Sequence, residues 1–317
     1  MRSLFVMDPL SRIVVTGDST YVVMRECTDR GFDVLMCTPD ALFAANGRAY
    51  ARAVPVKTGA AEPWFAVGDE TVIELGDVDV VWMRKDPPFD MTYIFTTYLL
   101  DMAPPSTLVV NDPKGLKLFN EKMWVQQRWP EFQPETRIAN RVADLVQFVR
   151  ERKGKSVLKP WDGNGGRGVV ITHADDRNLP SIAELLSGEG QHYVIAQAFI
   201  PEVEQGDKRI LLFDGEPVAG MMRIPLPEDH RANMHAGARV EATELSERDL
   251  EICAALSPEL KRHEQVFVGI DVINGFLTEI NVTSPTGIQE LNRLFDRKLE
   301  ADLVDVVMAK AEARRAS

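Results

Sequence analysis

The chain has 317 residues, of which 45% are hydrophobic and 26% are charged, and its formal net charge is −12. This length exceeds what one simple core usually serves, so two or three packed domains are expected. The acidic balance argues against a general nucleic-acid or membrane-surface binder, which would carry a basic patch, but it allows a local basic pocket for an anion.

The N-terminus and the cysteines indicate a cytoplasmic protein. The apolar run that opens the chain is interrupted by Asp8 and Pro9, so it predicts a first strand and not a signal peptide. The sequence contains no run of 18 apolar residues, so no membrane-spanning helix is expected. Cys27, Cys37 and Cys253 are scattered and form no CxxC pair, which fits a reducing compartment.

The first third of the chain predicts a parallel sheet. Residues 2–7 resemble a buried strand, a helix follows caps at residues 18–20 and ends at Gly31, and residues 32–37 predict a second strand. This strand–helix–strand order is typical of parallel sheets. The next predicted elements are a strand at 78–83, a helix at 93–102 and a strand at 108–110.

The composition changes after about residue 120. The middle part predicts helices at 122–129, 145–152 and 180–187 and strands at 156–159, 168–172 and 193–199. The last part predicts strands at 209–213, 217–223, 266–273 and 276–282 and helices at 246–262 and 298–314. The pattern indicates an α/β (α+β) protein in three parts, 1–121, 122–200 and 201–317.

Residues 268–282 predict a β-hairpin that turns at Asn274-Gly275. Glu279 and Asn281 are two residues apart and therefore share one face of their strand. A two-residue turn would point Asp271 away from them, whereas a three-residue loop ending in a left-handed Gly275 puts all three on one face. Because such hard oxygen donors suit Mg²⁺ bridging nucleotide phosphates, the metal hypothesis predicts the three-residue loop. The alternative is a solvated outer face.

Lys159 ends a predicted strand and precedes a glycine-rich loop. Gly163, Gly165 and Gly168 satisfy GxGxxG, but a strand follows them where the dinucleotide fingerprint needs a helix, and no GK[ST] is present. A glycine loop beside a strand-end lysine suits a lid whose backbone N–H groups cover phosphates. An ordinary glycine-rich hairpin is the alternative.

Two further features fit a nucleotide site. Lys122 is a candidate phosphate ligand or else a surface lysine. The strand at 193–201 ends in an apolar stretch whose free backbone could contact an adenine edge, or else it is a plain buried strand. Neither feature decides between its two interpretations alone.

In order along the chain, these elements resemble the ATP-grasp superfamily, and more closely the bacterial glutathione synthetases. The resemblance spans nearly the whole sequence. It is carried by VMDP at 6–9, MRKDPPFD at 83–90, NEK at 120–122, LKPWDG at 158–163, GDKR at 206–209, DGEP at 214–217, RIP at 223–225 and TEINVTSPT at 278–286. The stretches 165–169 and 225–239 depart from the family pattern.

The resemblance implies an ATP-grasp fold with an N-terminal parallel α/β domain, and the synthesis of glutathione, ADP and phosphate from ATP, γ-glutamylcysteine and glycine. It implies Mg²⁺, for which Mn²⁺ may substitute, on Asp271, Glu279 and Asn281. Lys122 and Lys159 would neutralise phosphate oxygens. The remaining implied ATP contacts are Gly163, Asn164, Gly165, Gly166, Gln197, Phe199, Ile200 and Asp207, the last on the ribose.

The resemblance also implies anion clamps and a substrate pocket. Arg209 and Arg223 would act on the reacting phosphate and the substrate carboxylate, and Arg84 follows a strand at the edge where α/β sheets bind ligands. The other implied substrate contacts are Asp8, Asn233, Gly237, Ser284 and Pro285. The family suggests a homotetramer. The alternatives are another ATP-grasp ligase with a different acid or amine, and a non-catalytic ATP-binding protein.

Overall fold

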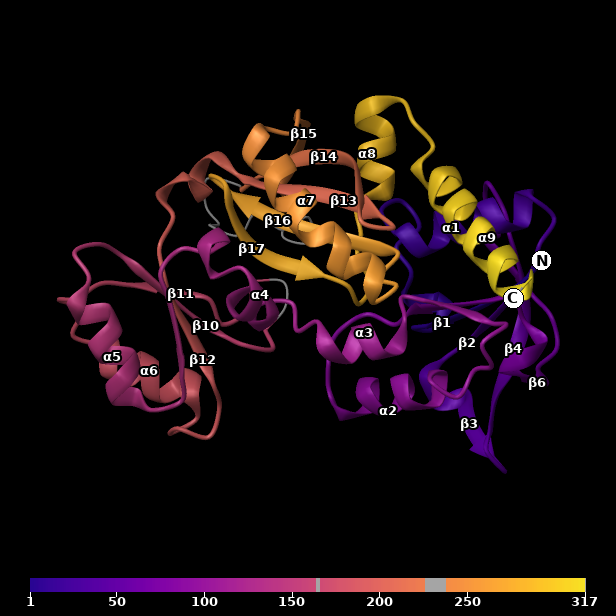
Figure 1. Ribbon diagram of the computed structural model, residues 1–317, viewed down its shortest axis with the longest axis horizontal. Coiled ribbons are helices and arrows are strands. Elements are labelled where there is room, and N and C mark those ends of the chain that lie inside the picture. The colour runs from indigo at the N-terminus through magenta and orange to yellow at the C-terminus, as the bar shows by residue number, and fades with distance from the viewer. Residues whose placement is uncertain (164–165, 226–237, 317) are drawn as a thin grey trace.

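The computed structural model describes residues 1–163, 166–225 and 238–316, which form three sheets along an elongated molecule (Figure 1). Short 3-10 turns occupy residues 10–12, 39–41, 75–77, 130–132 and 201–205. None of the helices in these ranges is both long and apolar enough to cross a membrane.

The first sheet has a parallel centre, as the sequence predicts. Its parallel strands are β1 (Arg2–Met7), β2 (Asp33–Cys37), β7 (Val80–Arg84) and β8 (Leu108–Val110), in the order β2-β1-β7-β8. The associated helices are α1 (Ser19–Asp29), α2 (Met91–Leu100) and α3 (Pro113–Leu118). The carboxyl ends of β1 and β7 therefore lie side by side, which is where parallel sheets place ligands.

An antiparallel extension of this sheet was not predicted. It consists of β3 (Leu42–Ala45), β4 (Arg48–Thr58), β5 (Phe65–Val67) and β6 (Thr71–Glu74). Buried and exposed residues alternate along much of β4, so its period-2 pattern is visible in the sequence.

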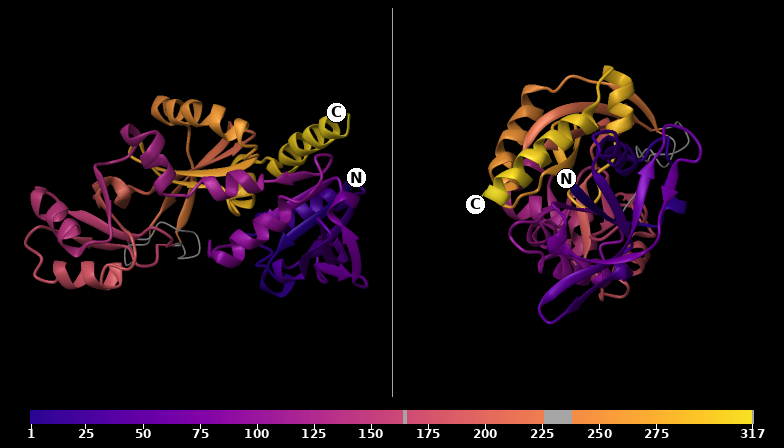
Figure 2. Two further views of the ribbon diagram at one scale, coloured as in Figure 1. Left: turned by 60° about the horizontal axis from the view of Figure 1, so that its bottom comes forward. Right: turned by 90° about the vertical axis from the view of Figure 1, so that its right-hand side faces the viewer.

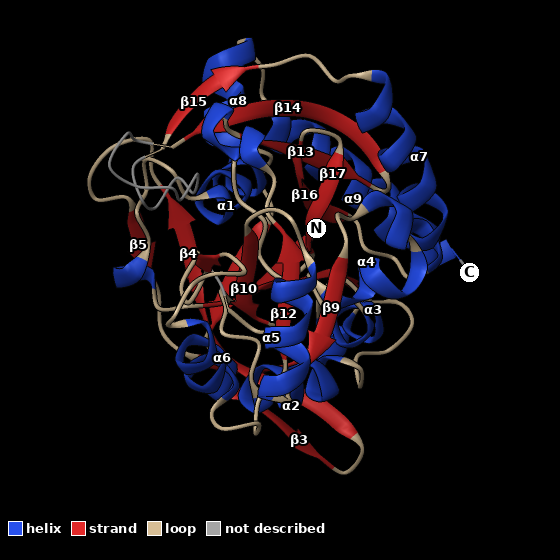
Figure 3. Ribbon diagram, turned by 90° about the vertical axis from the view of Figure 1, so that its left-hand side faces the viewer, coloured by secondary structure: helices blue, strands red, loops and turns tan. Residues whose placement is uncertain are grey.

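The second sheet lies at one end of the molecule (Figures 1 and 2). Its antiparallel strands are β9 (Thr136–Ala139), β10 (Ser156–Pro160), β11 (Val170–Thr172) and β12 (Val194–Ala198), with helices α5 (Val142–Glu151) and α6 (Leu179–Ser187) on its outer face (Figure 3). Leu145, Phe148 and Leu158 belong to a core made only of this part of the chain. Helix α4 (Met123–Arg128) leads into it.

The third sheet carries the predicted metal hairpin. Its strands are β13 (Asp207–Phe213), β14 (Glu216–Ile224), β15 (Arg239–Ala242), β16 (Phe267–Ile273) and β17 (Phe276–Asn281). The remaining helices are α7 (Glu247–Arg262), α8 (Ile288–Phe295) and α9 (Leu299–Ala316). Helix α9 returns to pack beside α1 (Figure 1), so the end of the chain covers the first sheet.

Asn111 joins the first sheet to the third. Its buried side chain donates to the backbone oxygens of Phe267 and Val282, each at 2.7 Å, and accepts from the Phe267 N–H at 2.8 Å. One hydrophobic core also runs through both sheets, with Leu4 and Val268 among its members. These contacts fix the carboxyl end of β8 against the start of β16 and the residue that follows β17.

The β16–β17 turn corrects the predicted three-residue loop. Ile273 pairs with Phe276, so the turn has two residues, and both Asn274 (φ 47°) and Gly275 (φ 75°) are left-handed. This is the backbone that a two-residue Asn-Gly hairpin prefers. The prediction of the loop length was therefore wrong, although Gly275 does take the left-handed conformation that it required.

A bulge at Thr278 restores the shared face. Val272 pairs with Leu277 but Asp271 pairs with Glu279, which leaves Thr278 as an extra residue in β17. Its hydroxyl donates to the Asp271 backbone oxygen at 3.1 Å. Asp271 and Glu279 consequently lie directly opposite each other on one face, by a different route from the one predicted.

Candidate active site

Cross-strand register places two arginines against two aspartates on the third sheet. Arg209 on β13 lies opposite Asp271 on β16, and Arg223 on β14 lies opposite Asp207 on β13. Arg209 donates to both Asp271 oxygens, at 2.5 and 2.9 Å, and Arg223 donates to both Asp207 oxygens at 2.6 Å. Because residues directly opposite across a pair of strands share a face, the four side chains form one ionic cluster.

Asp271 is the centre of this cluster. Arg223 also contacts its Oδ1 at 3.0 Å, and the Asn281 amide donates to its Oδ2 at 3.2 Å. Burial alone would raise the pKa of Asp271, but the two arginines outweigh it and hold the pKa well below its ordinary value. Asp271 is therefore a fixed anion, and its roughly four acceptor positions are all in use.

Asp207 behaves differently within the same cluster. Burial is the largest influence on it and, together with the neighbouring Asp271 charge, raises its pKa to about 6 despite Arg223. Both of its oxygens are occupied by Arg223. The structure thus places Asp207 as the anchor of an arginine, whereas the sequence resemblance assigned it to a ribose.

Two lysines from outside the third sheet converge on Glu279. Lys122, at the start of α4, places its Nζ 3.3 Å from Glu279 Oε1 and 2.6 Å from the Gly163 backbone oxygen. Lys159 on β10 is buried, and both Glu279 and Lys122 act on its charge. Two cations placed near Glu279 suit a phosphate chain, which carries several negative charges.

The pKa values of the two lysines shift in opposite directions. Burial would lower the pKa of Lys122, but Glu279 and Glu121 overcome it and raise the pKa above its ordinary value. Burial lowers the pKa of Lys159 to about 8, with Glu279 opposing the shift and Lys122 adding to it. Of these two lysines, Lys159 is therefore the one whose charge is less compensated by carboxylates.

The glycine loop begins beside these lysines. A Cβ on Gly163 would lie 2.6 Å from the Pro160 ring and 3.1 Å from the Arg167 backbone oxygen, so this position excludes any side chain. Gly166 has a φ of 74°, a left-handed backbone that glycine adopts without strain. Asn164 and Gly165 lie outside the described residues, as do Asn233 and Gly237.

The predicted adenine strand, β12, lies inside the second sheet between β10 and β9. Gln197 is buried in β12 and donates to Thr136 Oγ1 at 2.8 Å. Phe199 follows the strand and carries Lys155 over its ring at 5.6 Å, and Ile200 is buried behind it. The Gln197 side chain is thus engaged inside its own sheet.

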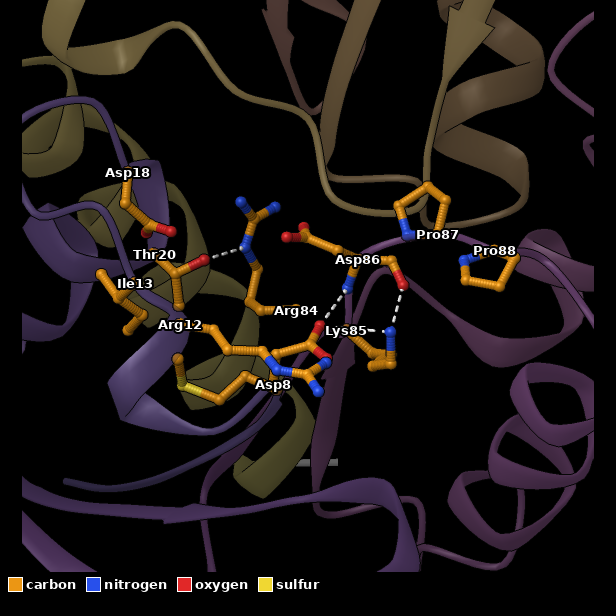
Figure 4. A pocket seen from close by; sticks show the side chains of 11 residues that line it. Asp8, Arg12, Ile13, Asp18, Thr20, Arg84, Lys85, Asp86, Pro87 and Pro88 are labelled. Carbon is orange, nitrogen blue, oxygen red and sulfur yellow. Dashed lines mark hydrogen bonds and ion pairs between the residues drawn. The ribbon is translucent and has the colours of Figure 1, made fainter. Parts of the chain in front are cut away.

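A cavity of about 290 Å³ opens at the carboxyl ends of β1 and β7 (Figure 4). Arg84 enters it from β7, with Nε 3.0 Å from Thr20 Oγ1 and Nη2 2.9 Å from the Pro285 backbone oxygen. Asp8 accepts from the Asp86 N–H at 3.1 Å and lies 3.2 Å from Lys85 Nζ. Ser284 adds a contact from its hydroxyl to the Arg84 backbone oxygen at 3.4 Å.

The loop after β17 connects the cavity to the ionic cluster. Arg84 donates to the backbone oxygen of Pro285, and Arg209 Nη1 donates to that of Thr286 at 3.4 Å. Two guanidinium groups therefore hold the carbonyls of two consecutive residues. The predicted Arg84, Ser284 and Pro285 contacts thus come together next to Arg209.

Sequence reasoning missed several residues of this region. Asp18, Thr20, Lys85 and Asp86 line the cavity, and Glu121, beside Lys122, accepts from Thr283 Oγ1 at 3.0 Å. Asp18 and Thr20 were interpreted only as helix caps. Their position, directly after the loop that follows a parallel strand, was the available signal.

Two family models match consecutive regions of the chain. The model described as prokaryotic glutathione synthetase, N-terminal domain, matches residues 1–117, and the model for the ATP-grasp domain of prokaryotic glutathione synthetase matches residues 121–296. The chain belongs to the prokaryotic glutathione synthetase family. This confirms the resemblance found in the sequence, and the members of this family are ATP-dependent ligases.

Relatives match the chain over nearly its full length. The glutathione synthetase of Parasynechococcus marenigrum (strain WH8102) is 43% identical over 306 residues, covering 96% of this chain and 98% of that protein. That of Agrobacterium fabrum (strain C58) is 41% identical over 309 residues, covering 97% and 96%. These matches cover all three sheets that contribute residues to the candidate site.

Solved structures confirm the ATP-grasp fold. D-cycloserine synthetase DcsG superposes with a TM-score of 0.67 at 13% identity, covering 98% of this chain and 99% of that one. The ATP-grasp ligase PsnB, complexed with a precursor peptide and AMPPNP, gives a TM-score of 0.62 at 15% identity, covering 98% of each chain.

Proposed function

We propose that the chain joins γ-glutamylcysteine to glycine at the expense of ATP, giving glutathione, ADP and phosphate through an acyl phosphate. Membership of the glutathione synthetase family supports this reaction. The observation that carries it is the convergence of Lys122 and Lys159 on Glu279, close to the Arg209–Asp271 pair. A carboxylate must be activated before an amine can displace its oxygen, and these charges suit the phosphoryl transfer that activates it.

The donor set of the hairpin fits a magnesium ion. Glu279 keeps an open carboxylate oxygen, and no described residue donates to Oδ1 of Asn281. Asp271 becomes available once Arg209 or Arg223 turns from it toward a phosphate. Three hard oxygen donors on rigid strands match the ligands that Mg²⁺ prefers, and Mn²⁺ accepts the same set. When bound, the ion would neutralise phosphate charge and fix its orientation.

The lysines and arginines of the site then have separate roles in the reaction. Lys122 and Lys159 contact phosphate oxygens and withdraw charge from them as the transferred group leaves ADP. Arg209 and Arg223 exchange their carboxylate partners for the transferred phosphoryl group, and so hold it where the substrate carboxylate attacks. Glycine then displaces the phosphate from the acyl group. Buried positions for these cations strengthen each contact, because water does not screen them.

The remaining assignments rest on the family and on the arrangement of the sheets. The three sheets support functional units at 1–121, 122–200 and 201–317, with the glycine loop at 163–168 covering the phosphates. Phe199 and Ile200 contact the adenine, and Asn233 and Gly237 contact the substrate. A cytoplasmic homotetramer completes the proposal, and sedimentation of the purified protein tests its size.

The reaction is tested by measuring ADP release from the purified protein with γ-glutamylcysteine, with and without glycine. The proposal expects release that requires both substrates, together with the appearance of glutathione. Release that ignores both substrates overturns it. Release that depends on a different acid or amine keeps the ATP-grasp ligase and replaces the substrates.

A further inference from the structure

The cavity at the ends of β1 and β7 contains charges that have no partner. Arg84 is only 5% exposed, yet no described carboxylate lies within ion-pair distance of its guanidinium. Its contacts are Thr20, the Pro285 backbone oxygen and the Phe267 ring, which lies 5.1 Å from its Cζ. Buried guanidinium groups are normally paired with an anion. This one is therefore ready for a carboxylate from outside the chain.

Asp18 lines the same cavity and is a carboxylate without a cation partner among the described residues. Its Oδ1 accepts from the Tyr21 N–H at 2.8 Å, and no described cation forms an ion pair with it. Burial raises the pKa of Asp18 above its ordinary value, although Tyr21 and the more distant Arg84 charge act against this. Figure 4 shows the Asp18 carboxyl group and the Arg84 guanidinium among the side chains that line this cavity.

The other charges of the cavity are mostly accounted for. Asp8 contacts Lys85 at 3.2 Å and Arg12 at 3.8 Å, and Asp86 is exposed. The lining thus holds three acidic and three basic side chains, a balance that does not suit a polyanion such as a nucleotide phosphate. A volume of about 290 Å³ lies at the small end of the range for ligand sites, roughly 300–1,000 Å³.

We infer that this cavity binds the zwitterionic α-amino-acid end of the donor substrate, with Arg84 on its carboxylate and Asp18 on its ammonium. This inference rests on the proposed function. It adds Asp18 as a specificity-determining residue that requires a free α-amino group on the donor, a group that takes no part in the bond being made.

The chemistry favours the donor over the acceptor at this position. An ammonium paired with Asp18 is held in its protonated form, whereas the acceptor amine must be neutral to attack. The bound end must therefore be one that does not react. The γ-glutamyl end of the donor meets this condition, because its α-amino and α-carboxylate groups lie at the far end from the reacting cysteinyl carboxylate.

The geometry lets one dipeptide span both sites. Arg84 and Arg209 hold the consecutive carbonyls of Pro285 and Thr286, so the cavity and the ionic cluster are separated by one short loop. Two α-linked residues extend about 7 Å, and the γ-glutamyl linkage makes the donor longer because it runs through the glutamate side chain. The Asp18 backbone is also fixed, because Gln289 donates to its oxygen at 2.7 Å, and Ser19 accepts from the Gly287 and Ile288 N–H groups.

The test compares γ-glutamylcysteine with glutarylcysteine, which is the same donor without its α-amino group. In the unaltered protein, kcat/KM for the glutaryl donor should be about 10–100-fold lower, the range of one lost charge-assisted hydrogen bond. Asp18→Asn keeps an oxygen to cap α1 but removes the charge. It should raise KM for the γ-glutamyl donor about tenfold or more, leave kcat nearly unchanged, and leave the glutaryl donor unaffected.

The outcomes separate the inference from the proposed function. If the unaltered protein turns over both donors equally well, or if Asp18→Asn weakens both alike, the ammonium contact is wrong although the ligase stands. If Asp86→Asn erases the discrimination and Asp18→Asn does not, the carboxylate is wrongly assigned. If no turnover is seen, calorimetric binding of the two donors to the whole protein tests whether the α-ammonium group is recognised. If the Asp18 variant fails to fold, the comparison of the two donors in the unaltered protein still tests this recognition.

Discussion

Arg209 and Asp271 lie directly opposite each other on β13 and β16, and the guanidinium contacts both carboxylate oxygens. Both side chains are buried, at 6% and 4% exposed. Asp271 is also the residue that the metal would need. The same carboxylate holds two arginines in the free protein. In the proposed reaction it would become a metal ligand when phosphate draws these arginines away.

Asp271→Asn should abolish most of the ligase activity. The change removes the anion that positions Arg209 and Arg223 and that contributes to the metal site. We expect ADP release to fall by at least about 100-fold, close to 2.7 kcal/mol of lost transition-state stabilisation. Breaking a buried ion pair should also lower the free energy of unfolding by about 3–5 kcal/mol. Steady-state kinetics in saturating Mg²⁺ and urea unfolding measure the two effects.

Asp214→Asn is the matched control for this change. Asp214 lies in the β13–β14 turn, where it contacts Lys310 at 2.8 Å and is partly exposed. Asparagine tolerates its left-handed φ of 48°, so activity should stay within about twofold. Activity of the Asp271 variant within a few-fold of the unaltered protein would show that the metal site is misplaced.

The affinity for ATP should fall as the pH rises above about 8. Burial holds the pKa of Lys159 near that value, so the lysine loses its charge in the range where an ordinary lysine keeps it. Only the protonated form attracts phosphate, so affinity should weaken by up to about tenfold per pH unit above the pKa. Lys159→Arg keeps a permanent charge and should flatten this slope. Equilibrium ATP binding between pH 7 and 9.5 measures both proteins.

Lys153→Arg supplies the comparison for the ATP experiment. Lys153 is exposed just ahead of β10, so its replacement should leave the slope with pH as it is in the unaltered protein. If the Lys159 variant shows the same slope of ATP affinity with pH as the unaltered protein, a group other than Lys159 causes the pH dependence.

Asn281→Ala should raise the requirement for Mg²⁺. The Asn281 amide oxygen faces no described donor, while its nitrogen contacts Asp271 at 3.2 Å. Removing one oxygen ligand should raise the half-saturating Mg²⁺ concentration by about 10–100-fold, the range seen when a metal site loses a supporting group. Excess Mg²⁺ should restore much of the rate. Titration of activity with Mg²⁺ gives the result.

A change at the tip of the same hairpin controls for loss of fold. Asn274→Gly replaces a residue with φ 47° by one that accepts that backbone freely, and it should not alter the Mg²⁺ curve. Asn281→Ala with an unaltered curve would remove Asn281 from the metal site.

The hairpin shows what sequence periodicity could and could not predict. The shared face of Asp271 and Glu279 was predicted, but through the wrong turn, because strict alternation from Asn274-Gly275 cannot anticipate an inserted residue. A local signal was present. Leu277, Ile280 and Val282 are all buried, and their spacing of three and then two residues breaks the alternation at the bulge.

The pairing of charges depended on contacts between distant segments. Nothing in the sequence order indicates that Arg223 faces Asp207, or that Arg84 and Arg209 hold adjacent carbonyls, because these depend on strand order and on a loop more than two hundred residues from β1. Parallel strands, helix caps and the hairpin are local patterns and were predictable. The antiparallel extension at β3–β6 was missed despite its alternation.

Asn111→Ala should loosen the joint between the first and third sheets. The change leaves the Phe267 N–H and the backbone oxygens of Phe267 and Val282 without their partner. Unpaired buried polar groups cost about 1–3 kcal/mol each, so we expect the main body to lose about 3–5 kcal/mol of stability. The second sheet has a core of its own, so amide exchange in β10 and β12 should stay unchanged while β8 and β16 exchange faster. Asn140→Ala removes one hydrogen bond to Gly190 at 3.0 Å. It should speed amide exchange in β10 and β12 and leave exchange in β8 and β16 unchanged. Equal acceleration in both sheets for the Asn111 variant would show that the molecule opens as one unit and that Asn111 is not a local joint.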